Sequence, residues 1–360
     1  MTTKQQQGQF YTVNCDYILE GLPIPPPFEG ERLIEPFAGK GDLLTWLGTK
    51  GTYSVEAYDI DPKAPGIQQR DTLLHPPDYT GAWVVTNPPY LARNKSEGKT
   101  LFDLYETNDL YKCFLLSLCR PSAAPCRGGI LILPAGFFLS PRDTDVRCRE
   151  AFLSRYRLLS VRYFEESVFP DTTTTVVAIS FVAASEGGLT EQEVEWTSLP
   201  SGQRRRFTMR AVDDWIIGGD IYRLMGSVAS AVRVRRYVEG LVLKEGEQLT
   251  HMTLCALDSG TMDGRIRLEY TEGYVYTGKE SSRSFATLCL LGRTLTAGQQ
   301  QSVCRRFNTF LEAKREATWS LFLPQYRESK EYARKRIPFE LAYTIVRWLL
   351  SPENIAATLG

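Results

Sequence analysis

The stretch "RLIEPFAGKGDLLTWLG", Arg32–Gly48, decides the fold. Its apolar strand pattern ends at the Gly-x-Gly of Gly39 and Gly41, and a helical pattern follows directly. The two glycines let the backbone turn tightly and approach a ligand closely. The third glycine of a dinucleotide loop is missing, and so is the Gly-Lys-Ser/Thr of a phosphate loop. The stretch therefore predicts either the ligand-binding end of an open α/β sheet or merely a tight turn.

Strand and helix patterns alternate along the chain from this point. Further strands are predicted at 54–60, 81–87, 128–134, 158–164 and 172–183, and helices at 101–119 and 145–156. The alternation predicts an α/β, Rossmann-like domain whose mostly parallel sheet is covered on both faces. Because the last two strand patterns are adjacent, we expect them to form an antiparallel hairpin at the edge of that sheet.

The alternation fades near residue 185, and a smaller α+β domain with helices near Gln299–Trp319 and Phe339–Leu350 is expected beyond it. We assign residues 1–200 to the first domain and 201–360 to the second, with the boundary within about 185–215. The formal net charge of zero conceals 18 Lys and Arg against 25 Asp and Glu in 1–200, and 24 against 17 in 201–360. A basic second half indicates a polyanionic partner, unless the charges segregate by chance.

The eight cysteines are scattered, without a Cys-x-x-Cys pair, and there are only two histidines. This pattern argues against a zinc site and is typical of a reducing compartment. The N-terminal "MTTKQQQGQF" lacks the apolar core of a signal peptide, and no apolar run approaches the length of a membrane span. We therefore expect a soluble cytoplasmic protein with no membrane partner and no metal.

Acidic residues stand at the next two strand ends, which are the end of the strand predicted at 54–60 and a third strand end at "RDTL" (70–73). Asp59 lies 20 residues past Gly39, the separation at which a carboxylate binds the ribose diol of a nucleoside ligand. Ile60 is placed to pack on an adenine face, and Asp71 to accept from an exocyclic amine. The alternative for both aspartates is a turn-forming role, which suits Asp61 before a proline better than it suits Asp59.

The fourth strand ends in Asn87-Pro88-Pro89-Tyr90. Prolines cannot donate to a sheet ladder, so the strand stops there and its polar groups are released from regular pairing. A Gly-rich turn, an acidic strand end and Asn-Pro-Pro-Tyr, in this order, resemble the γ class of S-adenosylmethionine-dependent DNA adenine-N6 methyltransferases. "GQFYT" (8–12), "DLYKCFLLSLC" (109–119), "GGILILPAGFFLS" (128–140) and "FEESVFPDTTTTVVAISF" (164–181) resemble further motifs of that class, in its order.

The resemblance covers roughly residues 8–182 and implies S-adenosyl-L-methionine as cofactor. The positions that it assigns to cofactor binding are Phe10, Tyr11, Thr12, Glu35, Pro36, Ala38, Gly39, Asp59, Ile60, Asp71 and Asn87. The Asn87 side-chain oxygen and the Pro88 carbonyl would accept from the adenine amine, in a loop that the prolines stiffen. The base must leave the duplex stack, and Tyr90 and Phe169 would stack on its two faces; ordinary core packing is the alternative for both rings.

Double-stranded DNA is the partner that the resemblance implies. The polar loop "ARNKSEGKT" (92–100) is a candidate for touching the DNA backbone, or is simply solvated. Basic clusters with neighbouring aromatics occur at 202–210, 233–237 and 332–339, where arginines would reach guanine edges or phosphates unless they are solvated surface charges.

Several alternatives remain open. Asn-Pro-Pro-Tyr also marks methyltransferases of a glutamine amide in translation release factors, but the short N-terminus and long second half favour DNA. RNA adenine is another substrate, and a non-catalytic nucleic-acid-binding module on a degenerate methyltransferase fold is an alternative of another class. For the DNA enzyme we expect a site-specific adenine methyltransferase of a restriction-modification system. Its site would be shared with a cognate restriction endonuclease, and it would act as a monomer or weak dimer.

Overall fold

The computed structural model describes residues 12, 14–24, 31–120, 124–169, 174–185, 188–227, 232–258, 265–326 and 334–359. The chain divides into two compact units, Met1–Trp215 and Ile216–Gly360. The division falls after Trp215, at the upper end of the range of about 185–215 in which the boundary was expected, and later than the assigned residue 200. The sequence from 201 to 215 therefore belongs with the first unit.

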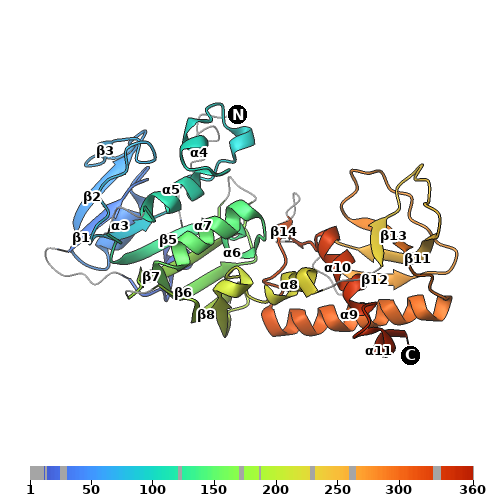
Figure 1. The fold of residues 1–360 in the computed structure, drawn as a ribbon. Helices are drawn as coiled ribbons and strands as arrows, with labels where there is room; N and C mark the ends of the chain where they lie inside the picture. Colours follow the sequence, from blue (N-terminus) through green and yellow to red (C-terminus); the bar gives the residue numbers. More distant parts are fainter. Residues whose placement is uncertain are drawn as a thin grey trace. The chain divides into compact units, whose positions relative to one another are not determined.

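The first unit is built on a nine-stranded sheet, counted over the described residues, in the order β3-β2-β1-β4-β5-β7-β6-β8-β9 (Figure 1). Its strands are β1 Arg32–Glu35, β2 Ser54–Asp59, β3 Gln68–Gln69, β4 Trp83–Thr86, β5 Gly128–Pro134, β6 Tyr156–Phe164, β7 Val176–Ala183, β8 Glu191–Leu199 and β9 Gln203–Arg210. The pairs β1·β2, β1·β4, β2·β3, β4·β5 and β6·β8 are parallel, whereas β5·β7, β6·β7 and β8·β9 are antiparallel. The predicted α/β fold with a mostly parallel sheet is thus confirmed.

The strand order reverses between β1 and β4. From β1 the chain proceeds outward through β2 and β3, whereas β4 and β5 extend on the other side. Open α/β sheets bind ligands at such a switch point, outside the carboxyl ends of the strands. Glu35–Gly41 and Asn87–Tyr90 both follow carboxyl ends at this point, so the fold brings the two motifs together.

The edge of the sheet differs from the prediction. The expected hairpin exists as β6 and β7, but β7 lies between β5 and β6, and the sheet continues through β8 to β9. The edge strand β9 comes from sequence that we assigned to the second domain. Its alternating pattern places Phe207 and Met209 on a buried face, where Phe207 packs against the buried Trp196 of β8 with ring centroids 6.5 Å apart.

The helices of the first unit are α2 Cys15–Leu19, α3 Asp42–Gly48, α4 Thr100–Leu104, α5 Leu110–Leu118, α6 Gly136–Leu139 and α7 Asp143–Leu153, together with the 3-10 turns η1 Arg93–Lys95 and η2 Ala211–Asp213. The single helix predicted at 101–119 is wrong, because α4 ends before Glu106, whose φ is +49°. Ala92 then bridges to Asp109, the N-cap residue of α5. The break places the residues after Tyr90 beside the start of α5.

Two glycines allow β5 to lie close to its neighbours. A Cβ atom on Gly129 would lie 1.7 Å from the Val84 carbonyl oxygen of β4, and one on Gly128 would lie 2.2 Å from the Phe181 carbonyl oxygen of β7. Both distances are shorter than any van der Waals contact, so only glycine fits at either position.

The second unit has a four-stranded antiparallel sheet in the order β10-β13-β11-β12. Its elements are α8 Asp220–Ser227, β10 Arg233–Arg236, β11 Glu247–Cys255, β12 Arg267–Tyr270, β13 Phe285–Leu291, α9 Ala297–Thr318, β14 Gln325–Tyr326, β15 Arg334–Lys335, α10 Phe339–Leu349 and α11 Ile355–Leu359. α9 packs against β11 and β12, and α10 packs against α8, α9 and β10. The predicted smaller α+β domain and its two long helices are therefore present.

All eight cysteines are free, and all except Cys15 are buried. Over the described part of the chain, no helix is both long and apolar enough to cross a membrane.

Candidate functional site

The turn after β1 has the geometry that its glycines predict. Gly39 and Gly41 have φ angles of +52° and +81°, in the left-handed region that favours glycine. Gly41 is the N-cap residue of α3, and its N–H donates to the Ala38 carbonyl at 2.7 Å. The Ala38 N–H donates to the Tyr58 carbonyl of β2 at 2.8 Å. The turn is thus fixed against the adjacent strand.

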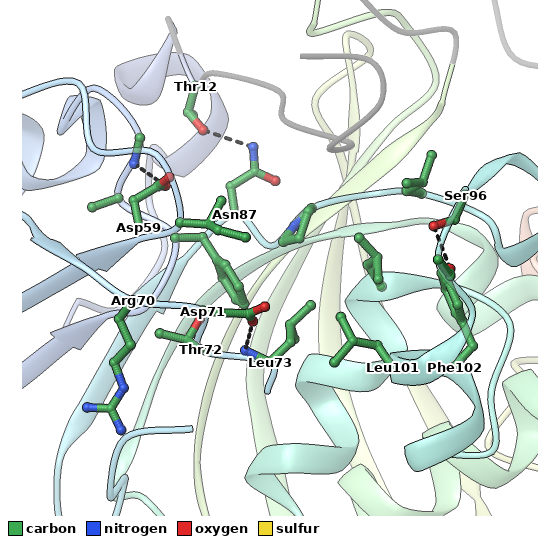
Figure 2. Close-up of a pocket in the computed structure, with 18 of the residues that line it drawn as sticks. Thr12, Asp59, Arg70, Asp71, Thr72, Leu73, Asn87, Ser96, Leu101 and Phe102 are labelled. Atoms are coloured by element: carbon green, nitrogen blue, oxygen red, sulfur yellow. Dashed lines mark hydrogen bonds between the residues drawn. The ribbon is translucent and has the colours of Figure 1, made fainter. Parts of the chain in front are cut away.

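Asp59 is buried at the end of β2 and connects this turn to its own loop. Its Oδ2 accepts from the Gly39 N–H at 2.8 Å (Figure 2). Its Oδ1 accepts from the Asp61 N–H at 2.8 Å. A carboxylate oxygen accepts more than one hydrogen bond, so these contacts are compatible with hydroxyl ligands. Asp61, in contrast, is half exposed and pairs with Lys63 at 2.5 Å.

Asp71 has the turn-forming role that the sequence leaves open. Its Oδ1 accepts from the N–H groups of Leu73 and Leu74 at 3.1 and 3.0 Å. The adjacent Thr72 donates its hydroxyl to the Pro36 carbonyl at 2.9 Å. Asp71 nevertheless faces the same cavity as Asp59 (Figure 2).

The side chain of Asn87 is buried immediately after β4. Its Nδ2 donates to the Thr12 Oγ1 at 3.1 Å, and its Oδ1 accepts from the Tyr90 hydroxyl at 2.5 Å. The Tyr90 oxygen also lies 2.7 Å from the Ile132 carbonyl oxygen of β5, and its single proton serves one of these two acceptors at a time. Pro88 and Pro89 have no N–H, so β4 cannot continue along β5 here, and the Tyr90 hydroxyl lies beside that carbonyl instead.

A cavity of about 280 Å³ lies over the switch point. Its lining consists of Thr12, Phe37, Ala38, Gly39, Asp42, Leu43, Asp59, Ile60, Arg70, Asp71, Thr72, Leu73, Asn87, Pro89, Leu91, Ser96, Gly98, Thr100, Leu101, Phe102 and Leu110. The fold therefore gathers most of the expected cofactor residues around one space. Ile60 is 47% exposed there, which is unusual for an isoleucine and leaves an apolar surface for a ligand.

Some of the expected residues lie elsewhere. Glu35, Pro36, Pro88, Tyr90 and Phe169 are not among the residues that line the cavity. Phe10 and Tyr11 lie outside the described residues.

Sequence patterns did not indicate the outer wall of the cavity. Leu101 and Phe102 of α4, Leu110 of α5, and the loop residues Ser96 and Gly98 form it. The signal was ambiguous because the apolar pattern of α4 equally suits a helix packed in the core. A nonpolar wall opposite Asp59 suits the flat, apolar part of a ligand whose polar part meets the carboxylate.

The loop that was a candidate for touching DNA uses two of its cations internally. Arg93 pairs with Asp103 at 2.7 Å, and the Lys99 ammonium donates to the carbonyls of Arg93 and Ser96. Ser96, Gly98 and Thr100 of the same loop line the cavity.

Glu35 is fully buried beside the Gly-rich turn. Its Oε1 accepts from the Phe37 N–H at 3.2 Å and from the Thr86 hydroxyl. Its Oε2 is buried and has no hydrogen-bond partner among the described residues. Burial raises the pKa of Glu35 to about 8, and the nearby Asp59 carboxylate contributes to the rise. A cation adjacent to Oε2 would reverse this shift.

The two aromatic rings that were assigned to base stacking are buried. Tyr90 is 8% exposed and Phe169 2% exposed. The Tyr90 ring meets the Tyr111 ring edge-on at 6.3 Å. Ordinary core packing, the alternative to base stacking, therefore describes both rings in this structure. Either ring would have to be uncovered before it could stack on a base.

Arginines of the first two basic clusters pair with other groups of the protein, although those of β9 remain exposed. On β9, Arg206 lies 3.8 Å from Glu193 and Arg210 lies 3.1 Å from Glu191, both on β8. In the second cluster, Arg235 pairs with Glu247 and Arg236 donates to the Ser282 carbonyl at 2.7 Å.

The third basic cluster is largely buried. Its described part includes the buried Arg334 and Lys335, and Lys335 donates to the Trp319 carbonyl at 2.8 Å.

Divided after Trp215, the chain carries 22 Lys and Arg against 27 Asp and Glu in the first unit and 20 against 15 in the second. The charge asymmetry is therefore smaller than the sequence division suggested.

No family model matches the chain, and no curated protein matches it. Solved structures do match. A modification subunit assigned to a type I restriction enzyme of Vibrio vulnificus has a TM-score of 0.41 and 17% identity, over 54% of this chain and 48% of that one. The type I EcoKI M protein has a TM-score of 0.38 and 12% identity, over 81% and 68% of the two chains.

A protein assigned to the class I S-adenosylmethionine-dependent methyltransferases, from Listeria monocytogenes, has a TM-score of 0.36 and 17% identity, over 52% of this chain and 64% of that one. The chain thus spans about half the length of the first of these proteins. At such identities and TM-scores the reaction has to be inferred from the site itself.

Proposed function

We propose that the first unit transfers a methyl group from S-adenosylmethionine to the N6 amine of an adenine in DNA. The observation that carries this proposal is the position of Asn87. Its buried carboxamide lines the same cavity as the Gly-rich turn and Asp59, on the adjacent strand of a switch point. A site for a nucleoside and an acceptor for a planar amine are thus combined in one space.

The residues fit the cofactor. Asp59 and Ile60 offer a carboxylate for ribose hydroxyls and an apolar surface for adenine, as in nucleoside sites at strand ends. The resemblance assigns Glu35 to the same cofactor, but its buried side chain does not line the cavity, and its Oε2 would have to be uncovered before it met the ammonium of the methionine part. The cavity is near the lower end of the usual range for ligand pockets, about 300–1,000 Å³.

The protein's part in the reaction is to orient the amine. When bound, the cofactor supplies an electrophilic methyl group. Asn87 Oδ1 and the Pro88 carbonyl would accept from the two N6 hydrogens and draw the nitrogen lone pair out of conjugation with the ring. Because the prolines fix the loop, these acceptors need little rearrangement, which is how preorganised polar groups lower a barrier. The proton can leave after transfer, so no basic residue is required.

The DNA would have to present the adenine outside the helix, since its amine cannot be reached within the stack. Tyr90 and Phe169 remain the candidates for holding the flipped base, and the motion that admits it would have to uncover them. We assign recognition of a specific duplex site to the second unit, in a restriction-modification setting with a cognate endonuclease. Arg305, on the exposed side of α9, is one of the cations available for phosphate contact.

Labelled cofactor distinguishes this proposal from its alternatives. The protein is incubated with methyl-labelled S-adenosylmethionine and with genomic DNA, total RNA or release-factor protein, followed by nucleoside and amino-acid analysis. We expect label in N6-methyladenine of DNA at a short recurrent sequence. Label only in RNA or in methylglutamine would reassign the substrate. Cofactor binding without transfer to any of the three would favour the non-catalytic module.

The role of Asn87 gives a sharper prediction. Asn87→Ala should lower the rate of methyl transfer about a hundredfold or more, the scale of losing one preorganised polar contact. Cofactor affinity, measured by calorimetry, should remain near wild type. Asp78→Ala is a control, because this aspartate is exposed and caps a turn away from the cavity. Turnover within severalfold of wild type in Asn87→Ala would exclude this role.

A further inference from the structure

Three successive arginines of β9 lie at the edge of the sheet that carries Asn87. This edge, the cavity edge, is formed by the carboxyl ends of β1, β4 and β5. β8 runs parallel to β6, so its carboxyl end and the first residues of β9 lie there too. One row of paired residues crosses the sheet from the last residue of β4 to the third residue of β9: Thr86, Leu131, Ile179, Val161, Trp196 and Arg205. Arg204, Arg205 and Arg206 are therefore level with the Asn-Pro-Pro-Tyr motif.

The separation along this edge follows from the order of the strands. Five steps between neighbouring strands lead from β4 to β9. Each step is about 4.8 Å, so the two backbones are about 24 Å apart. A duplex that lies along the cavity edge, with its target adenine at Asn87, would bring phosphates about seven base pairs away to β9, because DNA rises about 3.4 Å per base pair.

Carboxylates of β8 balance the half of β9 that is far from the cavity edge. Arg210 pairs with Glu191 at 3.1 Å, and Glu193 lies 3.8 Å from Arg206. Glu195 stands opposite Arg206 in the register. The side chains of both ion pairs are at least half exposed, so water screens the attraction. Arg206 can therefore exchange its partner for a phosphate with little loss of stability.

Uncharged residues of β8 face the half of β9 that is near the cavity edge. Trp196 and Thr197 stand opposite Arg205 and Arg204, and both arginines are exposed. Glu165, after β6, lies near this end, where its Oε2 accepts from the hydroxyl of the next β8 residue at 3.4 Å. Across the hairpin itself, positive charge is thus left at the end nearest the cavity edge.

Protection of the sheet is the ordinary reason for arginines on such a strand. β9 is the last strand of the described sheet, and charged side chains on an edge strand prevent its pairing with another chain. Charge of either sign, at any point along the strand, would serve that purpose. A contact with phosphates needs positive charge at the end that the duplex reaches, which is the arrangement on β9.

We propose that Arg204, Arg205 and Arg206 bind phosphates of the duplex about seven base pairs to one side of the adenine that enters the cavity. This inference rests on the proposed function, because DNA at Asn87 fixes the line along which the phosphates lie. It assigns part of the DNA contact to the first unit, in addition to the site recognition assigned to the second. Phosphate contacts carry no sequence information, so they strengthen binding to all duplexes alike.

DNA binding by the full-length protein tests the contact independently of catalysis. The triple glutamine variant, Arg204→Gln with Arg205→Gln and Arg206→Gln, should bind a fluorescent duplex of random sequence at least about tenfold more weakly. The slope of log affinity against log salt should become shallower by about two to three, since each phosphate contact contributes about one. Replacing the same three residues by lysine keeps the charge and should restore most of the affinity.

Arg210→Gln is the matched control. It removes a cation of the same strand that lies about 17 Å further from the cavity edge, and affinity should change by less than about twofold on that scale. Calorimetry with S-adenosylmethionine should give the same affinity for all variants, which shows that the first unit is folded. Equal losses of DNA binding in Arg210→Gln and in the triple glutamine variant would overturn the proposal.

A series of shortened duplexes locates the contact. Each arm beside the methylated adenine is shortened in turn, and wild-type affinity should drop when one of them falls below about seven base pairs. The triple glutamine variant should not show this drop. A drop of equal size in both proteins, or none in the wild type, would overturn the position of the contact.

Charge reversal separates DNA binding from protection of the edge. Replacing Arg204, Arg205 and Arg206 by glutamate keeps the edge charged, so light scattering should show no aggregation, while DNA binding should be weaker than in the triple glutamine variant. Wild-type DNA affinity in this variant would leave edge protection as the role of the arginines. Tighter binding of RNA than of DNA, lost in the same variants, would reassign the polyanion and overturn the DNA contact.

The outcomes distinguish this inference from the function on which it rests. A wild type that binds duplexes but methylates none would overturn the proposed function, while the comparison of the triple glutamine variant with Arg210→Gln still decides whether β9 contacts DNA. A wild type that methylates DNA, with unchanged affinity in the triple glutamine variant, would overturn the contact alone.

Discussion

The raised pKa of Glu35 predicts an unusual dependence of stability on pH. Folded protein retains this proton up to a pH of about 8, whereas the unfolded chain releases it near the ordinary value of 4.5. Since unfolding then releases a proton, the free energy of unfolding should decrease as the pH rises between these values. Urea unfolding at several pH values, without cofactor, measures this slope. Glu35→Gln should flatten it, and an unchanged slope in that variant would place the effect on another group.

The raised pKa of Glu35 could not be predicted from the sequence, since it depends on complete burial of the carboxyl group. The positions of Asp59 and Asn87, in contrast, followed from the rule that parallel strand ends meet at one edge of a sheet, and both line the cavity. The burial of Tyr90 could not be predicted either, because its contact with the Ile132 carbonyl joins residues 42 positions apart.

Secondary-structure elements were predictable where one periodicity extended through them. α3 and β5 have the bounds that their patterns indicate. The helix predicted at 101–119 failed because apolar spacing continues across the break, which depends on the distant bridge between Ala92 and Asp109. A buried ion pair then joins α5 to α7: the Lys112 ammonium contacts Asp145 Oδ1, and the Ser140 hydroxyl donates to Asp145 Oδ2 at 2.7 Å.

Removal of Lys112 should therefore be severe. Both partners are less than a tenth exposed, so Lys112→Met leaves a carboxylate buried without its cation and should lower the free energy of unfolding by about 3–5 kcal/mol. Adding Asp145→Asn should restore part of the loss, because it removes the buried charge. The control Lys63→Met breaks a half-exposed pair with Asp61 and should cost no more than about 1 kcal/mol. Chemical denaturation measures all three, and similar losses for the two lysines would contradict this account.

At the scale of the molecule, the sequence indicated two domains but not the extent of the first. The strand–helix alternation stops before β8 and β9, so nothing in the pattern connects these strands to the parallel sheet. Their attachment is tertiary, through the parallel pairing of β8 with β6 and the packing of Phe207 on Trp196. The second unit was foreseen only in outline, because its sheet pairs strands in the order β10-β13-β11-β12, which short strand patterns do not specify.

The boundary after Trp215 leads to a prediction about fragments. A fragment 1–215 retains the complete nine-stranded sheet and should fold and bind the cofactor. A fragment 1–200 lacks β9, which leaves the backbone edge of β8 and the Trp196 ring uncovered, and exposed apolar edges promote aggregation. Circular dichroism, light scattering and calorimetry with S-adenosylmethionine compare the two fragments. Equal solubility and affinity would show that β9 is dispensable to the first unit.

The buried cysteines can report how fast each unit of the protein opens. Thiol reagents attack the thiolate, and burial raises the pKa of Cys148 in the first unit and of Cys304 in the second to about 12. Each sulfur can therefore react only after the structure around it has opened. A brief pulse of alkylating reagent, followed by mass analysis of the peptides, would measure the opening rate of each unit separately. No label has to be engineered into the chain.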